Sequence, residues 1–168
     1  VMKPIILIGF MGVGKTSLGK KLAKKLRCNF IDTDKWIEKK TGKSISEIFQ
    51  TEGEAYFREL EKICVNELKE IKNTVVSVGG GLPCFNDTMK DLNVLGSTVY
   101  LKLETKELVR RLSESKIDRP LLQGMTGDNL ESFIEGKLLL REVFYSQAHF
   151  TIRPDRDFLD NCFKLFSY

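Results

Sequence analysis

The chain reads Ile5-Ile6-Leu7-Ile8-Gly9-Phe10-Met11-Gly12-Val13-Gly14-Lys15-Thr16 near its amino end. Four consecutive apolar residues predict a buried strand, and the residues from Gly9 to Thr16 fit the pattern G-x-x-x-x-G-K-[ST], which joins such a strand to a helix. Glycines let this loop turn tightly, so that successive N–H groups and the start of the helix converge on phosphate oxygens. The stretch therefore predicts a strand, a phosphate-binding loop and a helix, in that order.

Two residues at the end of the loop have expected roles in nucleotide binding. Lys15 would reach the β- and γ-phosphates of a nucleoside triphosphate, and the Thr16 hydroxyl would bind Mg²⁺. The motif alone leaves switches, motors and kinases open, although a GTPase would also carry D-x-x-G and N-K-x-D, neither of which occurs. The residues predicted to bind the nucleotide here are Gly12, Val13, Gly14, Lys15, Thr16 and Ser17.

Outward from this stretch, strand-like and helix-like patterns alternate along the chain. Apolar strand-like runs cover residues 4–8, 29–31, 74–78, 97–103 and 150–152. Helical periodicity covers residues 15–27, 34–41, 46–70 with a break near Gly53, 105–115 and 128–148. Alternation of this kind predicts parallel βαβ units with helices on both faces of the sheet. We expect an α/β three-layer sandwich formed by a single domain, residues 1–168.

Local signals predict where some of these elements begin. Ser44 with Glu47, and Asp128 with Glu131, have the spacing of a capping box at a helix start. Phenylalanines near the carboxyl end, from Phe158 to Phe166, predict a last helix that packs on the core. Residues 116–127 contain a proline and two glycines with weak periodicity, which is typical of a long functional loop that covers a site.

The composition excludes several classes of protein. The 168 residues include 27 Lys plus Arg and 23 Asp plus Glu, a net charge of +4, without the basic and aromatic pattern of a nucleic-acid surface. No run approaches the about 18 uncharged apolar residues of a membrane span. The four cysteines are too widely spaced for a zinc or redox motif, and one histidine cannot form a histidine-rich metal site. We expect a cytoplasmic protein with reduced thiols that binds neither nucleic acid nor membrane.

Two further strand ends carry residues suited to chemistry. Asp32 and Asp34 follow the strand at 29–31, so they lie at the edge where open α/β sheets bind ligands. We expect Asp32 to face the metal and Asp34 a substrate hydroxyl; the alternative is an Asx turn with a helix cap. The three glycines at 79–81 follow the strand at 74–78, where bare backbone suits close contact with a ligand, the alternative being a flexible turn.

Taken together, these motifs resemble the shikimate kinase family. The matching features are the phosphate loop at 9–16, Asp32-Thr33-Asp34, Phe57-Arg58-Glu59-Leu60-Glu61, Gly79 to Gly81, Arg119-Pro120-Leu121-Leu122, and Arg141 with Tyr145. They occur in the family's order and span roughly residues 4–153. The resemblance implies a fold similar to nucleoside monophosphate kinases, with a five-stranded parallel sheet, a substrate-binding region at about 34–61 and a mobile lid at about 112–125.

The resemblance also implies an activity, ATP- and Mg²⁺-dependent phosphorylation of the 3-hydroxyl of shikimate by a monomer. A carboxylate bearing hydroxyls needs arginine forks for the acid and an aspartate for the alcohols, which supports this reading. The substrate residues implied are Asp34, Phe49, Phe57, Arg58, Glu61, Gly79, Gly80, Gly81 and Arg141, with Glu61 steadying Arg58. Those implied for ATP and catalysis are Lys15, Asp34, Arg111, Arg119 and Arg156, with Thr16 and Asp32 for the metal.

Two alternatives remain open from the sequence. One is another small-metabolite kinase of the same fold, acting on gluconate or a nucleoside monophosphate. The other is a non-catalytic nucleotide-binding protein whose acceptor site has degenerated. Intact residues at each expected catalytic position argue against the second.

Overall fold

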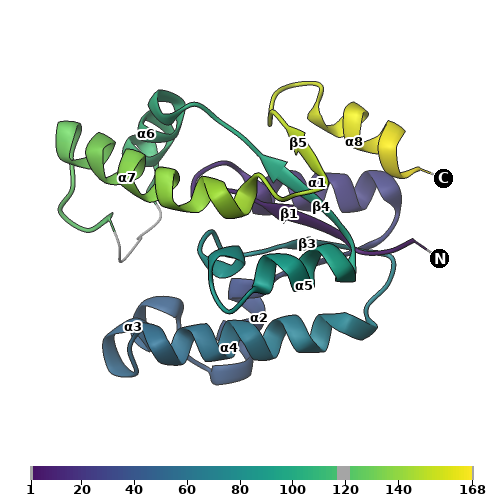
Figure 1. The fold of residues 1–168 in the computed structure, drawn as a ribbon, viewed down its shortest axis with the longest axis horizontal. Helices are drawn as coiled ribbons and strands as arrows, with labels where there is room; N and C mark the ends of the chain where they lie inside the picture. Colours follow the sequence, from purple (N-terminus) through teal and green to yellow (C-terminus); the bar gives the residue numbers. More distant parts are fainter. Residues whose placement is uncertain (1, 117–121, 168) are drawn as a thin grey trace.

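The computed structural model describes residues 2–116 and 122–167, and within them five strands form one sheet (Figure 1). The strands are β1 (Ile5–Ile8), β2 (Asn29–Asp32), β3 (Thr74–Ser77), β4 (Ser97–Leu101) and β5 (Phe150–Ile152). All pairings are parallel, in the order β2-β3-β1-β4-β5. The predicted five-stranded parallel sheet is confirmed.

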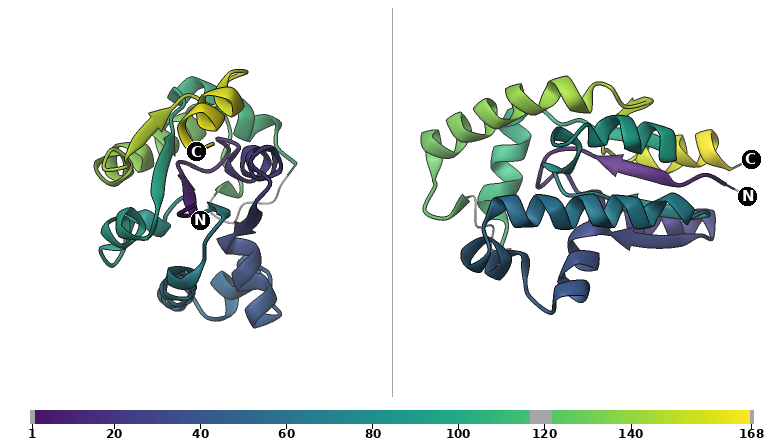
Figure 2. Two further views of the ribbon diagram at one scale, coloured as in Figure 1. Left: turned by 90° about the vertical axis from the view of Figure 1, so that its right-hand side faces the viewer. Right: turned by 60° about the horizontal axis from the view of Figure 1, so that its bottom comes forward.

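Helices lie on both sides of this sheet. They are α1 (Lys15–Leu26), α2 (Thr33–Thr41), α3 (Ile45–Thr51), α4 (Glu54–Glu67), α5 (Thr88–Leu95), α6 (Thr105–Glu114), α7 (Gly127–Tyr145) and α8 (Phe158–Phe166), with short 3₁₀ turns η1 (Leu68–Glu70) and η2 (Leu82–Cys84). Figure 2 shows α1 and α8 on one face and α4, α5 and α7 on the other. This is the predicted three-layer arrangement.

Burial explains why β1 reads as an uninterrupted apolar run. All four residues of β1 are fully buried, since helices cover both faces of a parallel sheet and leave no solvent side. A second, smaller apolar cluster joins α2, α3 and α4 and contains Ile37, Ile48, Phe57 and Leu60. This cluster holds together the segment 34–61 that the sequence predicts to bind substrate.

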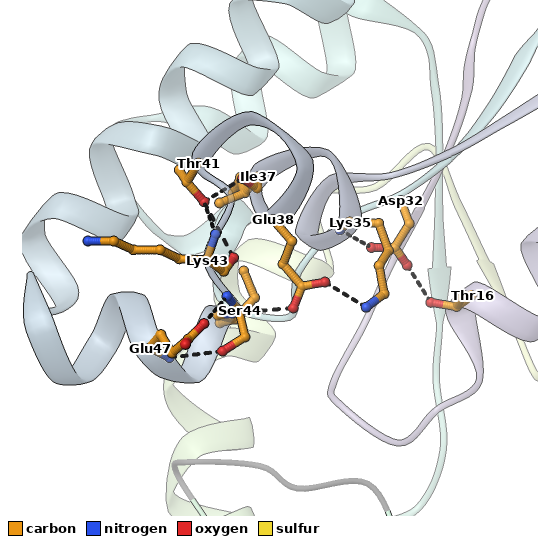
Figure 3. Close-up of polar contacts among 10 residues, drawn as sticks. Thr16, Asp32, Lys35, Ile37, Glu38, Thr41, Lys43, Ser44 and Glu47 are labelled. Carbon is orange, nitrogen blue, oxygen red and sulfur yellow. Dashed lines mark hydrogen bonds and ion pairs between the residues drawn. The ribbon is translucent and has the colours of Figure 1, made fainter.

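Two predicted helix starts have different outcomes. The capping box at Ser44 is confirmed: the Glu47 amide donates to the Ser44 hydroxyl (3.1 Å), and the Ser44 amide donates to the Glu47 carboxylate (2.6 Å) (Figure 3). The box at Asp128 is wrong, because α7 begins at Gly127 after Thr126 and has no side-chain cap. Here the backbone enters the helix one residue before the predicted cap.

Other predictions concern single elements. The break near Gly53 is confirmed, with Gly53 at φ 85° between α3 and α4. The last helix is also confirmed as α8, in which Phe158 is fully buried and Phe166 packs on the core, whereas Phe163 is exposed. We did not predict α5, a helix of eight residues preceded by Asp87 in a left-handed conformation without a side-chain cap. Its short length and missing cap leave little sequence signal.

The described residues also test the predictions on the cysteines and on membrane-spanning helices, and they cover part of the predicted lid. All four cysteines are free thiols, as the spacing predicts. None of the helices in the described ranges is long and apolar enough to cross a bilayer. The predicted lid at about 112–125 includes residues 117–121, which lie outside the described residues.

Replacement of Gly96 by alanine should destabilise the fold. A Cβ at Gly96 would lie 2.1 Å from the carbonyl oxygen of Pro4, a backbone atom that cannot rotate away. We expect a loss of about 1–3 kcal/mol in the free energy of unfolding, measured by urea denaturation. The control Gly136→Ala, at an open helical position in α7, should instead gain about 0.5–1 kcal/mol. Equal stability of the two variants would contradict the packing of β4 against Pro4.

Candidate active site

The phosphate loop connects β1 to α1. Gly9, Gly12 and Gly14 all adopt positive φ angles, of 147°, 83° and 99°, which side chains rarely tolerate. The Lys15 ammonium donates hydrogen bonds to the carbonyls of Gly9 (2.7 Å) and Phe10 (2.9 Å), so the lysine lies over its own loop. α1 begins without a side-chain cap, which leaves its first amides available for an anion.

Two oxygen ligands for a cation lie side by side next to this loop. The Thr16 hydroxyl donates to Asp32 Oδ2 (2.6 Å), while Asp32 Oδ1 accepts from the Lys35 amide (3.1 Å) and caps α2 (Figure 3). A hydroxyl and a carboxylate are hard oxygen donors, and Mg²⁺ in kinases binds such groups together with phosphate oxygens. The pair therefore fits Mg²⁺ held jointly by protein and nucleotide.

A cavity of about 340 Å³ opens beside the loop, within the usual range for small-molecule sites. Its lining comprises Met11, Gly12, Gly14, Lys15, Thr16, Ser17, Asp32, Asp34, Ser77, Val78, Gly79, Gly80, Arg111 and Ser115. The structure thus brings together most of the residues predicted for the nucleotide and the metal, along with Asp34, which is predicted to bind a substrate hydroxyl. Val13 does not line the cavity, because its side chain is buried in the core.

Two carboxylates meet near Gly79. A Cβ at Gly79 would lie 3.1 Å from Asp34 Oδ1 and 3.2 Å from Glu61 Oε1, and neither oxygen has a hydrogen-bond partner among the described residues. Burial, reinforced by the charge of Asp32, raises the pKa of Asp34 to about 6. Burial likewise raises the pKa of Glu61 to about 7, against the opposing charge of Arg58. Both carboxylates are therefore poised to change charge near neutral pH.

Arg58 lies behind these carboxylates, on α4. Its guanidinium donates to Glu61 (2.7 Å) and Glu54 (3.0 Å), and it stacks 4.0 Å from the ring centroid of Phe85. The side chain is 10% exposed, so a helix arginine that would normally be solvated is fixed in a buried position. The Glu61 contact agrees with the expectation that Glu61 steadies Arg58.

Arg141 approaches the same place from α7. It is 8% exposed and lies 5.3 Å from the ring centroid of Phe10 in the phosphate loop. A Cβ at Gly80 would lie 3.4 Å from Arg141 Nη1, and one at Gly81 would lie 2.7 Å from Arg58 Nη2. Glycine at both positions lets the two guanidinium groups pack directly on the backbone.

The two aromatic residues implied for the substrate also meet in the structure. Phe49 on α3 and Phe57 on α4 have ring centroids 4.9 Å apart. The Arg58 guanidinium carbon lies 5.3 Å from the Phe57 centroid. Phe57 therefore connects the apolar cluster of α2, α3 and α4 to Arg58 within the predicted substrate-binding region.

The three remaining arginines have different positions. Arg111 donates to the Val13 carbonyl (3.2 Å) and to Glu107 (3.1 Å), which places it at the rim of the phosphate loop. Arg156 is exposed between β5 and α8 and does not line the cavity. Arg119 lies outside the described residues.

Sequence reasoning missed several polar residues at the site. Ser77 and Ser115 line the cavity, and Thr33 accepts a hydrogen bond from the Gly79 amide (3.0 Å). Ser77 follows two valines at the end of β3, a signal that could have revealed it. Thr33 gives no such signal, because its partner is 46 positions away.

Comparison with known proteins agrees with this arrangement. The family model for shikimate kinase matches residues 11–160. A shikimate kinase from Parabacteroides distasonis is 43% identical over 155 residues, 92% of this chain and 90% of its own length. The crystal structure of shikimate kinase from Bacteroides thetaiotaomicron superposes with a TM-score of 0.92 at 42% identity, covering 98% of both chains. Shikimate kinase from Acinetobacter baumannii, solved in complex with shikimate, has a TM-score of 0.88 at 36% identity and covers 98% of this chain and 93% of its own.

The raised pKa of Asp34 predicts a pH-dependent effect on stability. The folded-state pKa of about 6 lies above the ordinary value of 3.8, so ionising Asp34 lowers the free energy of unfolding. This loss is complete above about pH 7 and absent below about pH 4, where the carboxyl is protonated in both states. Asp34→Asn should therefore stabilise the ligand-free protein at pH 7.5, by at most about 3 kcal/mol, with the gain vanishing toward about pH 4. Thermal melts across this range, with a chelator present to keep divalent cations from Asp32, measure it.

The control for this series is Asp160→Asn on α8. Asp160 is exposed and pairs with Lys25, whose hydrogen bond lowers the pKa of Asp160. Loss of that pair should slightly lower the melting temperature at neutral pH. A gain at Asp34→Asn that is equal at all pH values would contradict a buried ionised carboxylate.

Proposed function

The chain belongs to the shikimate kinase family, and from that membership we propose how its residues perform the reaction. The enzyme transfers the γ-phosphoryl group of ATP to the 3-hydroxyl of shikimate, with Mg²⁺ as cofactor, a step of aromatic amino-acid biosynthesis. One observation carries the assignment of residues: among the described side chains, buried polar atoms without partners occur on Asp34, Arg58, Glu61 and Arg141. A ligand with a carboxylate and several hydroxyls would pair with these atoms.

The phosphate loop is proposed to bind ATP. Its glycines and the first amides of α1 would hold the phosphates, and Lys15 would turn from its loop carbonyls to the β- and γ-phosphates. Thr16 and Asp32 would hold Mg²⁺, which neutralises charge on the phosphates when bound. The 2.6 Å contact between their oxygens supports this pairing.

The acceptor is proposed to lie across the cavity, between the arginines and Asp34. Arg58 and Arg141 would form charge-assisted hydrogen bonds with the shikimate carboxylate, helped by the amides of Gly80 and Gly81. Asp34 would bind the ring hydroxyls and hold the 3-hydroxyl toward the γ-phosphate. Since the transition state of phosphoryl transfer is loose, Asp34 acts more as a positioner than as a strong base. A pKa of about 6 still allows it to accept the proton.

Three further arginines complete the proposed donor site. Arg119, in the lid predicted at about residues 112–125, would approach the transferring phosphoryl group, where an arginine stabilises charge on the equatorial oxygens. Arg111, at the rim of the phosphate loop, and Arg156 would contact the adenine. The Arg111 hydrogen bond to Val13 supports its placement, whereas Arg119 and Arg156 rest on the family resemblance.

We also propose that one domain, residues 1–168, acts as a cytoplasmic monomer without nucleic acid. A single chain supplies every residue assigned above, which supports a monomer. The net charge of +4 without a basic and aromatic surface pattern supports the absence of nucleic acid.

The function is tested by ADP release. With ATP and Mg²⁺, shikimate should stimulate ADP formation strongly, while quinate, gluconate and AMP should not, because only shikimate offers both the carboxylate and the correctly placed hydroxyl. A coupled spectrophotometric assay measures the rates. Stimulation by AMP or gluconate would overturn the acceptor assignment, and no stimulation by any acceptor would favour a binding protein.

The proposed carboxylate clamp predicts a selective loss of acceptor affinity. Arg58→Lys and Arg141→Lys should each raise KM for shikimate about 10- to 100-fold, because lysine cannot form the forked pair that a carboxylate accepts. KM for ATP should stay within about threefold of the wild-type value. Arg110→Lys, an exposed arginine of α6 paired with Glu107 and Glu114, is the matched control and should change neither constant. A rise in KM for ATP equal to that for shikimate would contradict the clamp.

A further inference from the structure

The three glycines at 79–81, here called the glycine turn, have most of their backbone groups already bonded. The Gly79 carbonyl accepts from the Leu82 amide (3.1 Å), and the Gly81 carbonyl accepts from the Cys84 amide (3.0 Å). These bonds belong to the turn itself and continue into η2. They leave the Gly80 carbonyl and the three glycine amides without a partner in the turn itself.

Two side-chain hydroxyls from distant parts of the chain complete these bonds. Thr33, the fully buried first residue of α2, accepts from the Gly79 amide at 3.0 Å. Tyr145, the fully buried last residue of α7, donates to the Gly80 carbonyl. The two hydroxyls that bond the turn therefore come from two different helices, α2 and α7, which are far apart in the sequence.

After these bonds, two adjacent donors remain. Within the part of the chain that the structure describes, the amides of Gly80 and Gly81 have no hydrogen-bond partner. Consecutive free N–H groups form a site for an anionic oxygen. The guanidinium groups of Arg58 and Arg141 also pack against this turn, in space that a Cβ at Gly81 or Gly80 would occupy or crowd.

Three consecutive glycines have more conformational freedom than any other tripeptide, and an anion site built on them loses affinity unless something fixes the backbone. We propose that Thr33 and Tyr145 are positioning residues for the acceptor: their hydroxyls fix the glycine turn so that its two free amides and the two arginines face the substrate carboxylate together. This inference rests on the proposed function and adds to it two residues that do not themselves touch the substrate.

Removal of either hydroxyl should act mainly on the acceptor. In Thr33→Val the shape of the side chain is kept, but the Gly79 amide loses its partner and the turn must shift to find another. In Tyr145→Phe the Gly80 carbonyl loses its partner in the same way. The phosphate loop keeps its own contacts through Lys15, so nucleotide binding should change little.

Steady-state kinetics of the purified full chain test the proposal. We expect Thr33→Val and Tyr145→Phe each to raise KM for shikimate about tenfold, the equivalent of about 1.4 kcal/mol, while KM for ATP stays within about twofold. Thr33→Ser keeps the hydroxyl and should restore a KM for shikimate close to the wild-type value. This rescue separates the hydroxyl's role from a general effect of changing a buried residue.

Two residues of β4, Thr98 and Tyr100, provide matched controls. Thr98→Val removes a hydroxyl that is equally buried but bonds Asn93 and the His149 amide, away from the cavity. Tyr100→Phe removes the hydroxyl of a neighbouring tyrosine, whose partner is Glu142. Both controls lose a hydrogen bond, and both should leave KM for shikimate unchanged.

Each outcome decides between the inference and its premise. If the wild-type chain shows no shikimate-dependent ADP release, the proposed function fails before the variants are considered. If the wild type is active but Thr33→Val and Tyr145→Phe keep a normal KM for shikimate, the inference is overturned. It is also overturned if KM for ATP rises as much as KM for shikimate in these variants. The same holds if Thr98→Val and Tyr100→Phe raise KM for shikimate as much as Thr33→Val and Tyr145→Phe do. Thermal melts identify a variant that fails to fold, and the remaining variant then decides.

Discussion

The whole site depends on the alignment of three strand ends in one parallel sheet. Leu7 of β1 and Asp32 of β2 both stand in register with Ser77 of β3, so the three strands end within one residue of the same level. The phosphate loop, the two aspartates and the glycine turn each begin within two residues of these ends. Since β1 is fully buried, the helices that cover it fix this level, and a one-residue slip would separate the three groups.

The same alignment concentrates charge that a folded chain would otherwise avoid. Asp34, Glu61, Arg58 and Arg141 are gathered at the glycine turn with polar atoms that lack partners among the described residues. Burial raises the pKa values of both carboxylates, which means that their charged forms are disfavoured in the ligand-free protein. A site of this kind trades stability for groups that are already oriented toward a charged ligand.

The features of the fold and site that the sequence predicts are those whose determining residues lie close together in the chain. The phosphate loop, the strands and the capping box at Ser44 depend on residues close together in sequence, and all were recognised. Thr33 and Tyr145 lie 46 and 65 positions from their glycine partners, so their roles depend on the register between β2 and β3 and on the place where α7 ends. The substrate-binding roles of Arg58 and Arg141 came only from the resemblance, because an isolated arginine on a helix is normally solvated. Local signals can also mislead: Asp128 and Glu131 have the spacing of a capping box, but the helix begins at Gly127.

The division of work between Asp32 and Asp34 follows from one turn of backbone. Asp32 ends β2 and is bonded on both oxygens, by the Thr16 hydroxyl and by the amide at the start of α2. Asp34 lies two residues on, inside the first turn of α2, where one oxygen faces Gly79 without a partner among the described residues. This difference supports the proposal that the first aspartate serves the nucleotide side of the cavity and the second the acceptor. Thr33 stands between the two aspartates and accepts from the Gly79 amide, so under the proposed function one tripeptide links the metal-binding aspartate, the glycine turn and the acceptor-binding aspartate, which in-line transfer requires to be held in fixed relation.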